Sequence, residues 1–142
     1  MTNKIYIDWN NFHKDAKLLA QKLKSYGNFS RIVAVSRGGF IPAGIIAYEL
    51  GIRHCDAVCI ASYDAEIKRN DNNVELGTAL QNVDENTVII DDLADSGRTL
   101  QILRKQYPQA TFACVYAKPA GQKFCDVYAC PMADSWVVFP WD

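Results

Sequence analysis

Several features that would classify a protein at once are absent from this chain. Its net charge is only −1 over 142 residues and its lysines are scattered, so there is no basic stripe of the kind that binds nucleic acid. No apolar run approaches the ~20 residues that cross a membrane, and no signal-peptide core follows Met1. Five cysteines at irregular spacing argue against a disulfide framework and match no structural zinc pattern. These absences predict a single domain over residues 1–142 in the cytoplasm, with neither nucleic-acid partners nor integral membrane association, and leave peripheral attachment to the inner membrane open.

The most informative segment is an apolar run that ends in acidic and then small residues. Residues 87–90 are four β-branched residues in a row, which is typical of a strand buried on both faces. Asp91 and Asp92 follow at once, at the strand end where open α/β sheets bind ligands. Residues 96–99 then offer backbone amides, hydroxyls and a helix N-terminus to an anion. Since acids repel an anion, they should face a cation or sugar hydroxyls, as they would in a magnesium-bound sugar phosphate.

A second strand, turn and helix lies earlier in the chain. Residues 31–35 form a short apolar strand and residues 41–50 an apolar helix. Between them, Gly38 and Gly39 let the backbone approach an anion without a clashing side chain, and Arg37 adds a guanidinium for phosphate oxygens. Glycines after a strand also make plain sharp turns, but two strand–loop–helix units in one small chain favour phosphate binding.

The remaining segments alternate between helical and extended patterns. Apolar residues at helical spacing predict an amphipathic helix over 11–26, with its lysines on a solvated face. Its candidate caps are Asp8, Asn10 and Asn11. Further expected elements are a strand over 56–61, a helix that continues to Pro108, and a strand over 111–117. Strands that alternate with helices in this way predict an α/β fold with a mostly parallel sheet.

Residues 87–99 resemble the signature with which type I phosphoribosyltransferases bind 5-phosphoribosyl 1-pyrophosphate (PRPP). The shared pattern is four aliphatic positions, two acids, two variable positions, then Thr or Ser, Gly, any residue and Thr. The similarity covers nearly the whole chain and extends to purine-using members of the family, through residues 34–39, 58–60, 91–93, 116–121 and 136–142. It implies the type I phosphoribosyltransferase fold, a mostly parallel sheet flanked by helices, with a small C-terminal hood over about 118–142. It also implies transfer of the phosphoribosyl group to N9 of guanine, xanthine and, more weakly, hypoxanthine, with Mg²⁺ as cofactor.

The resemblance assigns roles to the residues of the PRPP site. The expected pyrophosphate loop, in which the family often has a cis peptide that we place near Arg37–Gly38, consists of Ser36, Arg37, Gly38 and Gly39. Asp92 would face Mg²⁺ and the ribose hydroxyls, with Asp91 assisting. The expected 5′-phosphate loop consists of Asp95, Ser96, Gly97, Arg98 and Thr99. A lid over about 63–77 would bring Lys68 and Arg69 to the leaving pyrophosphate.

The resemblance also assigns the purine site. Asp95 would lie beside N7, where it either takes the proton or only orients the base. Lys118 would bind the oxygen on C6, Trp136 would stack on the ring, and the main chain of Val137 would contact C2. The expected catalytic residues are Asp91, Asp92, Asp95 and Arg69.

Some features depart from the family pattern, and other interpretations stay open. Arg98 stands where purine-using members have glycine, and the lid is longer and rich in asparagine. The alternatives within the family are a hypoxanthine-guanine-preferring enzyme and a non-catalytic PRPP sensor. A phosphatase or receiver-like domain built around Asp91 and Asp92 is the alternative outside it. The apolar helix over 41–50 and the aromatic C-terminal end exceed what a small sheet can cover, which predicts self-association. Because the family forms dimers and tetramers, the resemblance implies a homotetramer.

Overall fold

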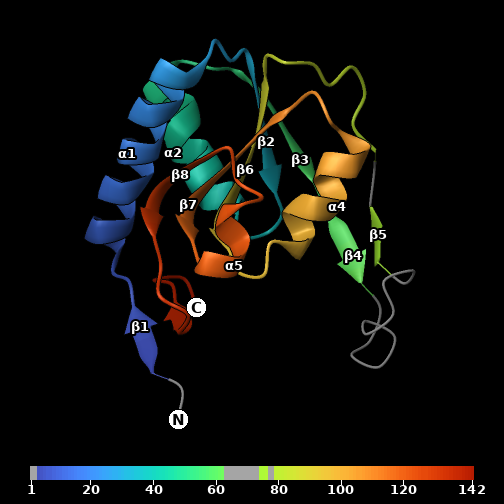
Figure 1. Cartoon of the computed structure of the whole chain (residues 1–142). Coiled ribbons are helices and arrows are strands. Elements are labelled where there is room, and N and C mark those ends of the chain that lie inside the picture. Colours follow the sequence, from blue (N-terminus) through green and yellow to red (C-terminus); the bar gives the residue numbers. More distant parts are fainter. Residues whose placement is uncertain (1–2, 63–73, 77–78) are drawn as a thin grey trace.

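The computed structural model describes residues 3–62, 74–76 and 79–142. Its centre is a five-stranded sheet in which all neighbouring strands are parallel (Figure 1). In the sheet order β3-β2-β6-β7-β8, the strands are His54–Val58, Arg31–Val35, Thr87–Ala94, Thr111–Ala117 and Val127–Pro131. Because parallel strands end on the same side, the carboxyl ends of β2 and β6 share one end of the sheet. The predicted α/β fold with a mostly parallel sheet is therefore confirmed.

Helices cover both faces of this sheet (Figure 1). α1 (Trp9–Tyr26) and α2 (Phe40–Leu50) pack on one face and α4 (Arg98–Gln106) on the other. Of the three candidate caps of α1, it is Asp8 whose carboxylate accepts the Asn11 N–H, at 2.8 Å. The buried side chains fall into one cluster on each face, and each fully buried leucine or isoleucine contributes about 1.5–3 kcal/mol. The sheet is thus fixed from both sides.

Three small elements stand outside the main sheet. β1 (Lys4–Tyr6) pairs in parallel with β9 (Trp136–Val138), so the two ends of the chain lie together. β4 (Ile60–Ser62) pairs antiparallel with β5 (Val74–Leu76). The short helix α5 (Pro119–Gln122) follows β7 directly. We call residues 118–142 the hood: they contain α5, the sheet strand β8 and β9, and the purine-binding role expected of them stays a prediction.

The structure differs from the sequence-based boundaries in two places that matter for the site. The strand expected over 56–61 is wrong, because β3 ends at Val58 and β4 belongs to another sheet. Val58 O accepts the Ser36 N–H at 2.9 Å, and beyond that bond β2 has turned away, so β3 loses its partner. β6 instead runs on past Ile90 to Ala94, which places Asp91 and Asp92 inside a strand rather than in a loop.

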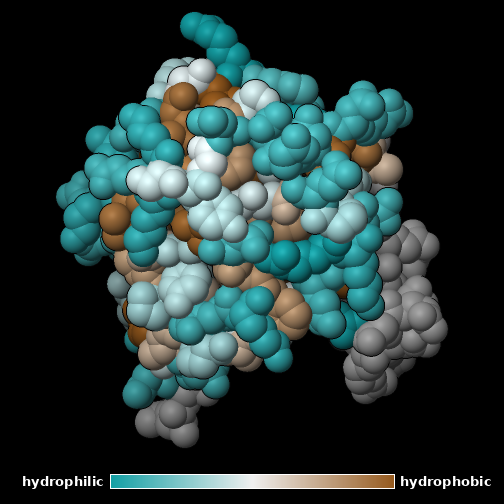
Figure 2. Space-filling model, turned by 45° about the horizontal axis from the view of Figure 1, so that its top comes forward, coloured by the Kyte–Doolittle hydropathy of each residue, from teal (hydrophilic) through white to brown (hydrophobic). Residues whose placement is uncertain are grey.

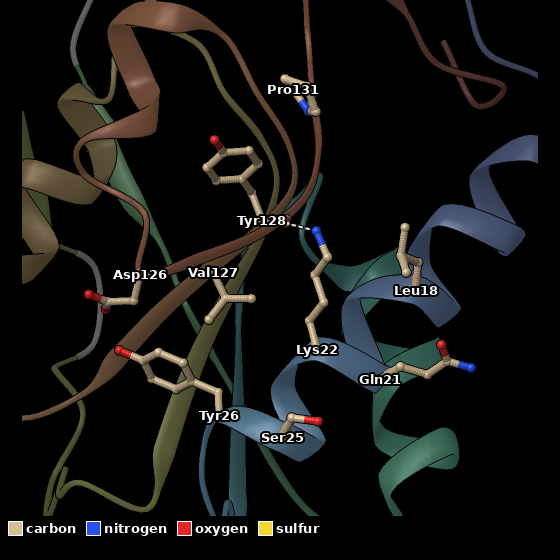
Figure 3. A pocket seen from close by; sticks show the side chains of 9 residues that line it. All are labelled: Leu18, Gln21, Lys22, Ser25, Tyr26, Asp126, Val127, Tyr128 and Pro131. Atoms are coloured by element: carbon tan, nitrogen blue, oxygen red, sulfur yellow. Dashed lines mark hydrogen bonds between the residues drawn. The ribbon is translucent and has the colours of Figure 1, made fainter.

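Lys22 departs from the expectation that the lysines of α1 only face solvent. Its ammonium donates to the carbonyls of Tyr128 at 3.1 Å and Ala129 at 2.9 Å, in β8 at the edge of the sheet. Figure 3 shows Lys22 reaching from α1 toward that strand, across a groove that Leu18, Tyr26 and Val127 also line. Edge carbonyls left open invite pairing with another chain, so Lys22 protects this edge.

The face turned toward the viewer in Figure 2, with the top of Figure 1 brought forward, is predominantly hydrophilic, with small scattered apolar areas. No extended apolar patch is visible in the described part of that face. Among the residues with a described position, no helix is both long and apolar enough to cross a membrane.

Candidate functional site

The predicted acid pair lies at the carboxyl end of β6. Asp91 Oδ1 accepts the backbone N–H of Asp92 at 2.8 Å, which fixes one carboxylate along the chain. Burial raises the pKa of Asp91 well above its ordinary value, and the neighbouring charge of Asp92 raises it further. Burial also raises the pKa of Asp92, although hydrogen bonds to Asp91 and the backbone oppose the shift. Two partly buried carboxyls are thus held together with no cation among the described side chains to neutralise them.

The turn after β2 lies against this acid pair. A Cβ placed on Gly38 would overlap the carboxylate of Asp92, with Cγ only 2.7 Å away. A Cβ on Gly39 would overlap Ile90 O and lie 2.6 Å from Val35 O. Both glycines are therefore needed for close approach, and the turn from Ser36 to Gly39 lies directly against Asp92 of β6.

The same turn contains the non-proline cis peptide that was expected there. It joins Ser36 to Arg37, one residue before the predicted position. The turn ends in two bonds that start α2, from Gly39 N–H to Val35 O at 2.8 Å and from Phe40 N–H to Arg37 O at 3.0 Å. Arg37 is exposed, so its guanidinium is accessible to a ligand at this end of the sheet.

The second predicted loop joins β6 to α4. Gly97 precedes α4 with φ +85°, a left-handed conformation that favours glycine. The Arg98 N–H donates to Ser96 Oγ at 3.3 Å, and Asp95, Ser96 and Arg98 are exposed. The loop directs the N-terminus of a nine-residue helix toward the end of the sheet that holds the acids, and such a terminus favours an anion.

Lys118 and Asp95 meet between this loop and the hood. The Lys118 side chain is 8% exposed, and its ammonium lies 3.3 Å from Asp95 Oδ1. The backbone holds the pair in place, since Lys118 N–H donates to Ala94 O at 2.9 Å. Gly121 packs so closely on Ala94 that a Cβ there would overlap the Ala94 carbonyl. A buried ammonium beside an exposed carboxylate presents a donor and an acceptor side by side.

The remaining predicted purine contacts lie on β9. Trp136 is 63% exposed, so its indole face is accessible, whereas the Val137 side chain is buried. Trp136 N–H donates to Asn3 O and Val138 O accepts the Ile7 N–H. Backbone groups alternate in direction along a strand, so those of Val137 point away from β1. The second tryptophan of this end, at position 141, stacks on Phe139 with ring centroids 4.7 Å apart, in the aromatic cluster of the core.

Some features of the site escaped sequence reasoning. Asp142 accepts the Phe139 N–H at 2.9 Å, and its carboxylate lies near enough to Asp92 to help raise the pKa of that residue. The ring of Phe124 packs on Gly97. The approach of Asp142 to Asp92 and the packing of Phe124 on Gly97 have no local sequence signal, because each joins segments far apart in the chain. Of the expected lid over 63–77, including Lys68 and Arg69, only 74–76 fall within the described residues, as β5.

Comparisons with known proteins agree with this arrangement. A family model described as Phosphoribosyl transferase domain matches residues 2–142. A xanthine-guanine phosphoribosyltransferase of Desulfotalea psychrophila is 41% identical over 137 residues, which cover 96% of this chain and 84% of that protein. The solved purine phosphoribosyltransferase of Pyrococcus horikoshii is 26% identical, with a TM-score of 0.84 over 98% of this chain and 94% of its own.

A xanthine-guanine-hypoxanthine phosphoribosyltransferase of Helicobacter pylori shares the fold, with a TM-score of 0.80 at 20% identity, over 98% of this chain and 94% of that one. The likeness in fold thus persists where little identity remains. The acids of β6, the glycine turn after β2 and the loop before α4 lie at one end of the sheet. Because the family model also matches nearly every residue, this chain belongs to the phosphoribosyltransferase family.

Proposed function

We propose that this protein is a purine salvage enzyme. It transfers the phosphoribosyl group of PRPP to N9 of guanine, xanthine and, more weakly, hypoxanthine, giving GMP, XMP or IMP and releasing pyrophosphate. The observation that carries the proposal is the contact of Asp92 with Gly38, since it joins the acids and the pyrophosphate turn in one site. The 41% identity to a xanthine-guanine phosphoribosyltransferase supports the choice of purines.

PRPP would span the two loops at the carboxyl end of the sheet. Its pyrophosphate lies in the turn from Ser36 to Gly39, where Gly38 has no side chain to obstruct it and the exposed Arg37 supplies a positive charge. Its 5′-phosphate lies in the loop from Asp95 to Thr99, at the N-terminus of α4. Lys68 and Arg69, outside the described residues, are the proposed cations for the leaving group.

The acid pair fits a magnesium ion. Burial raises the pKa of both Asp91 and Asp92, and the nearby charge of Asp142 raises that of Asp92 further, so a cation bound beside these carboxyls would favour their charged form. Carboxylate oxygens suit Mg²⁺, which is usually held by one or two carboxylates together with substrate phosphates. No group of three or more metal-binding side chains occurs among the described residues, consistent with a site that substrate oxygens must complete. Asp92 is the proposed ligand, and Mg²⁺ would neutralise charge on the leaving pyrophosphate.

The residues of this chain would stabilise an oxocarbenium-like transition state from both ends. Positive charge grows on the ribose ring near Asp92 and Asp91, while negative charge grows on pyrophosphate near the Ser36 turn and Arg37. Fixed groups of this kind typically contribute about 3–4 kcal/mol each when removed singly. As N9 of the purine attacks C1 of the ribose, Asp95 takes the proton from N7.

Lys118 and Asp95 also support the choice of a 6-oxopurine. N7 and the oxygen on C6 lie on one edge of the purine, and the 3.3 Å separation of the two side chains suits simultaneous contact with both. Adenine presents an amino group at C6, a donor that would face the donor Lys118. Trp136 would stack on the ring, and the outward backbone groups of Val137 would meet the substituent on C2.

The test is an assay of the purified protein with PRPP, Mg²⁺ and each purine base, followed by chromatography of the nucleoside monophosphates. GMP and XMP are the expected main products. A higher kcat/KM for hypoxanthine than for xanthine would favour the hypoxanthine-guanine alternative. Binding of PRPP without product from any 6-oxopurine would favour the non-catalytic sensor and overturn the proposal.

We further propose a homotetramer. Apart from Glu49, α2 has no charged residue, yet Phe40 and Tyr48 are 51% and 91% exposed. A helix that is hydrophobic all round is normally buried, so another subunit is the proposed cover. Multi-angle light scattering should give four times the 15.9 kDa chain mass, and Tyr48→Asp should lower it. A monomer at micromolar concentration would refute this assembly.

The proposed location is the cytoplasm. All five cysteines are free thiols in the structure, including the buried Cys114, which suits a reducing compartment.

A further inference from the structure

The hood contacts both ends of the loop that precedes α4. On one side, Gly121 of α5 packs on Ala94, where β6 ends. On the other side, the ring of Phe124 packs on Gly97, where α4 begins. The loop from Asp95 to Thr99 is therefore contacted at both ends by one short segment of the hood, residues 121–124.

The contact between Phe124 and Gly97 leaves no free space. A Cβ on Gly97 would lie 2.9 Å from Cε2 and 3.1 Å from Cγ of Phe124, and closer still to Cδ2. Gly97 is buried although Ser96 and Arg98 on either side are exposed. The aromatic ring thus packs against Gly97, whose left-handed backbone sets the direction of the helix N-terminus.

Phe124 is itself held at both its backbone groups. Its N–H donates to Gly121 O at 3.0 Å, and its carbonyl accepts from Arg104 Nε at 2.9 Å. Arg104 belongs to α4 and also pairs with Asp126 at 2.8 Å. The backbone that carries the ring is therefore fixed to α4 as well as to the hood, so Phe124 cannot shift as a whole away from Gly97 without breaking these bonds.

We propose that Phe124 is a positioning residue for the 5′-phosphate of PRPP. It holds the Gly97 backbone and the N-terminus of α4 in the conformation that receives the phosphate, without touching the substrate. This role rests on the proposed function, because it takes the loop from Asp95 to Thr99 as the phosphate site.

The test compares Phe124→Ala with Phe124→Leu, and with Phe29→Ala as matched control. Phe29 is also a partly buried phenylalanine beside a glycine, since a Cβ placed on Gly27 would lie 3.4 Å from its ring, and it lies two residues before the amino end of β2. F124A should raise KM for PRPP by about 10- to 100-fold, as expected for a displacement of ~1 Å, with KM for guanine changed less than about threefold. F124L, which still covers Gly97, should restore most of the PRPP affinity.

A readout that needs no catalysis separates this inference from the proposed function. Hydrogen–deuterium exchange of amides 96–99 should be faster in F124A than in wild type and unchanged in F29A. In calorimetric titrations, ribose 5-phosphate should bind F124A at least about tenfold more weakly than wild type, which corresponds to ~1.4 kcal/mol of binding free energy. If F124A does not fold, Phe124→Val serves in the same comparison.

The outcomes differ for the two proposals. Wild-type protein that forms no nucleotide but binds ribose 5-phosphate more tightly than F124A refutes the enzyme and keeps the positioning role. Active wild type with equal PRPP KM in F124A and F29A refutes the positioning role and keeps the enzyme. Equal loss of affinity for guanine and PRPP in F124A would reduce Phe124 to a structural residue of the hood.

Discussion

Substituting the two glycines of the pyrophosphate turn should have opposite consequences for activity and stability. In Gly38→Ala the new methyl group meets the carboxylate of Asp92, a side chain that can rotate away. In Gly39→Ala it meets Ile90 O and Val35 O, which belong to the paired backbones of β6 and β2 and cannot yield. Neither glycine has a positive φ, so the difference comes from these contacts alone.

The magnitudes follow from what must move. Relief of the overlap in G38A displaces the Asp92 carboxylate by roughly 1 Å, and misplacement on that scale costs about 10²-fold in kcat/KM. The unfolding free energy of G38A should fall by less than about 1 kcal/mol, because the Asp92 side chain can rotate away from the new methyl group. Overlap with backbone costs more, so G39A should lose about 3 kcal/mol or more of unfolding free energy.

The assay combines steady-state kinetics for PRPP with urea unfolding. Gly27→Ala is the control, because Gly27 has an extended backbone and its new Cβ would make only an ordinary 3.4 Å contact with Phe29. G27A should match wild type in both measurements. Full activity in G38A, with Asp92 in its original position in a crystal structure, would refute the reasoning.

Three further substitutions probe the chemistry of the site. Asp95→Asn should lower kcat by about 10²- to 10⁴-fold with little change in purine Kd by calorimetry, whereas equal losses would mean that the residue only orients the base. Lys118→Met should lower kcat/KM for guanine by at least about tenfold and narrow the discrimination against adenine, and unchanged discrimination would contradict the role of its ammonium. Because burial raises the pKa of Asp91, the neutral carboxyl favours the folded state. This contribution is fully present below the unfolded-state pKa, about 4, and is lost as pH rises through the folded-state pKa. Without Mg²⁺, Asp91→Asn should therefore have a higher Tm than wild type at about pH 7.5, with the difference shrinking toward pH 4; a constant difference would contradict this sign.

The sequence was sufficient for the parts of the site that depend on local chemistry. Four β-branched residues before Asp91 predicted a buried central strand, and β6 is one. The glycines after β2 predicted a turn that approaches an anion; the structure shows that their missing side chains also make room for Asp92 and for the strand backbones. Both signals are strong because burial and steric exclusion limit the residue types that fit.

Features that depend on contacts between distant segments were not predictable in this way. β3 ends at Val58 because β2 turns away, although the apolar pattern continues to Ala61. The edge strand β8 alternates between buried and partly buried side chains, but its sequence VYACP shows no matching alternation of polar and apolar residues, so it was not predicted. The packing of Phe124 on Gly97 joins residues on two different elements that neither local spacing nor propensity connects.

The pairing of β1 with β9 has a consequence for how the enzyme loses activity. Contact between Ile5 and Val137 closes a loop of nearly the entire chain, and it is secured by only three residues on each strand. Long loops are entropically costly to close, so under mild denaturation this ribbon should fray before the central sheet melts. A partly denatured enzyme would then still bind its sugar phosphate and, through Lys118, the oxygen on C6, but it would lose the contacts of Trp136 and Val137 with the ring and with C2.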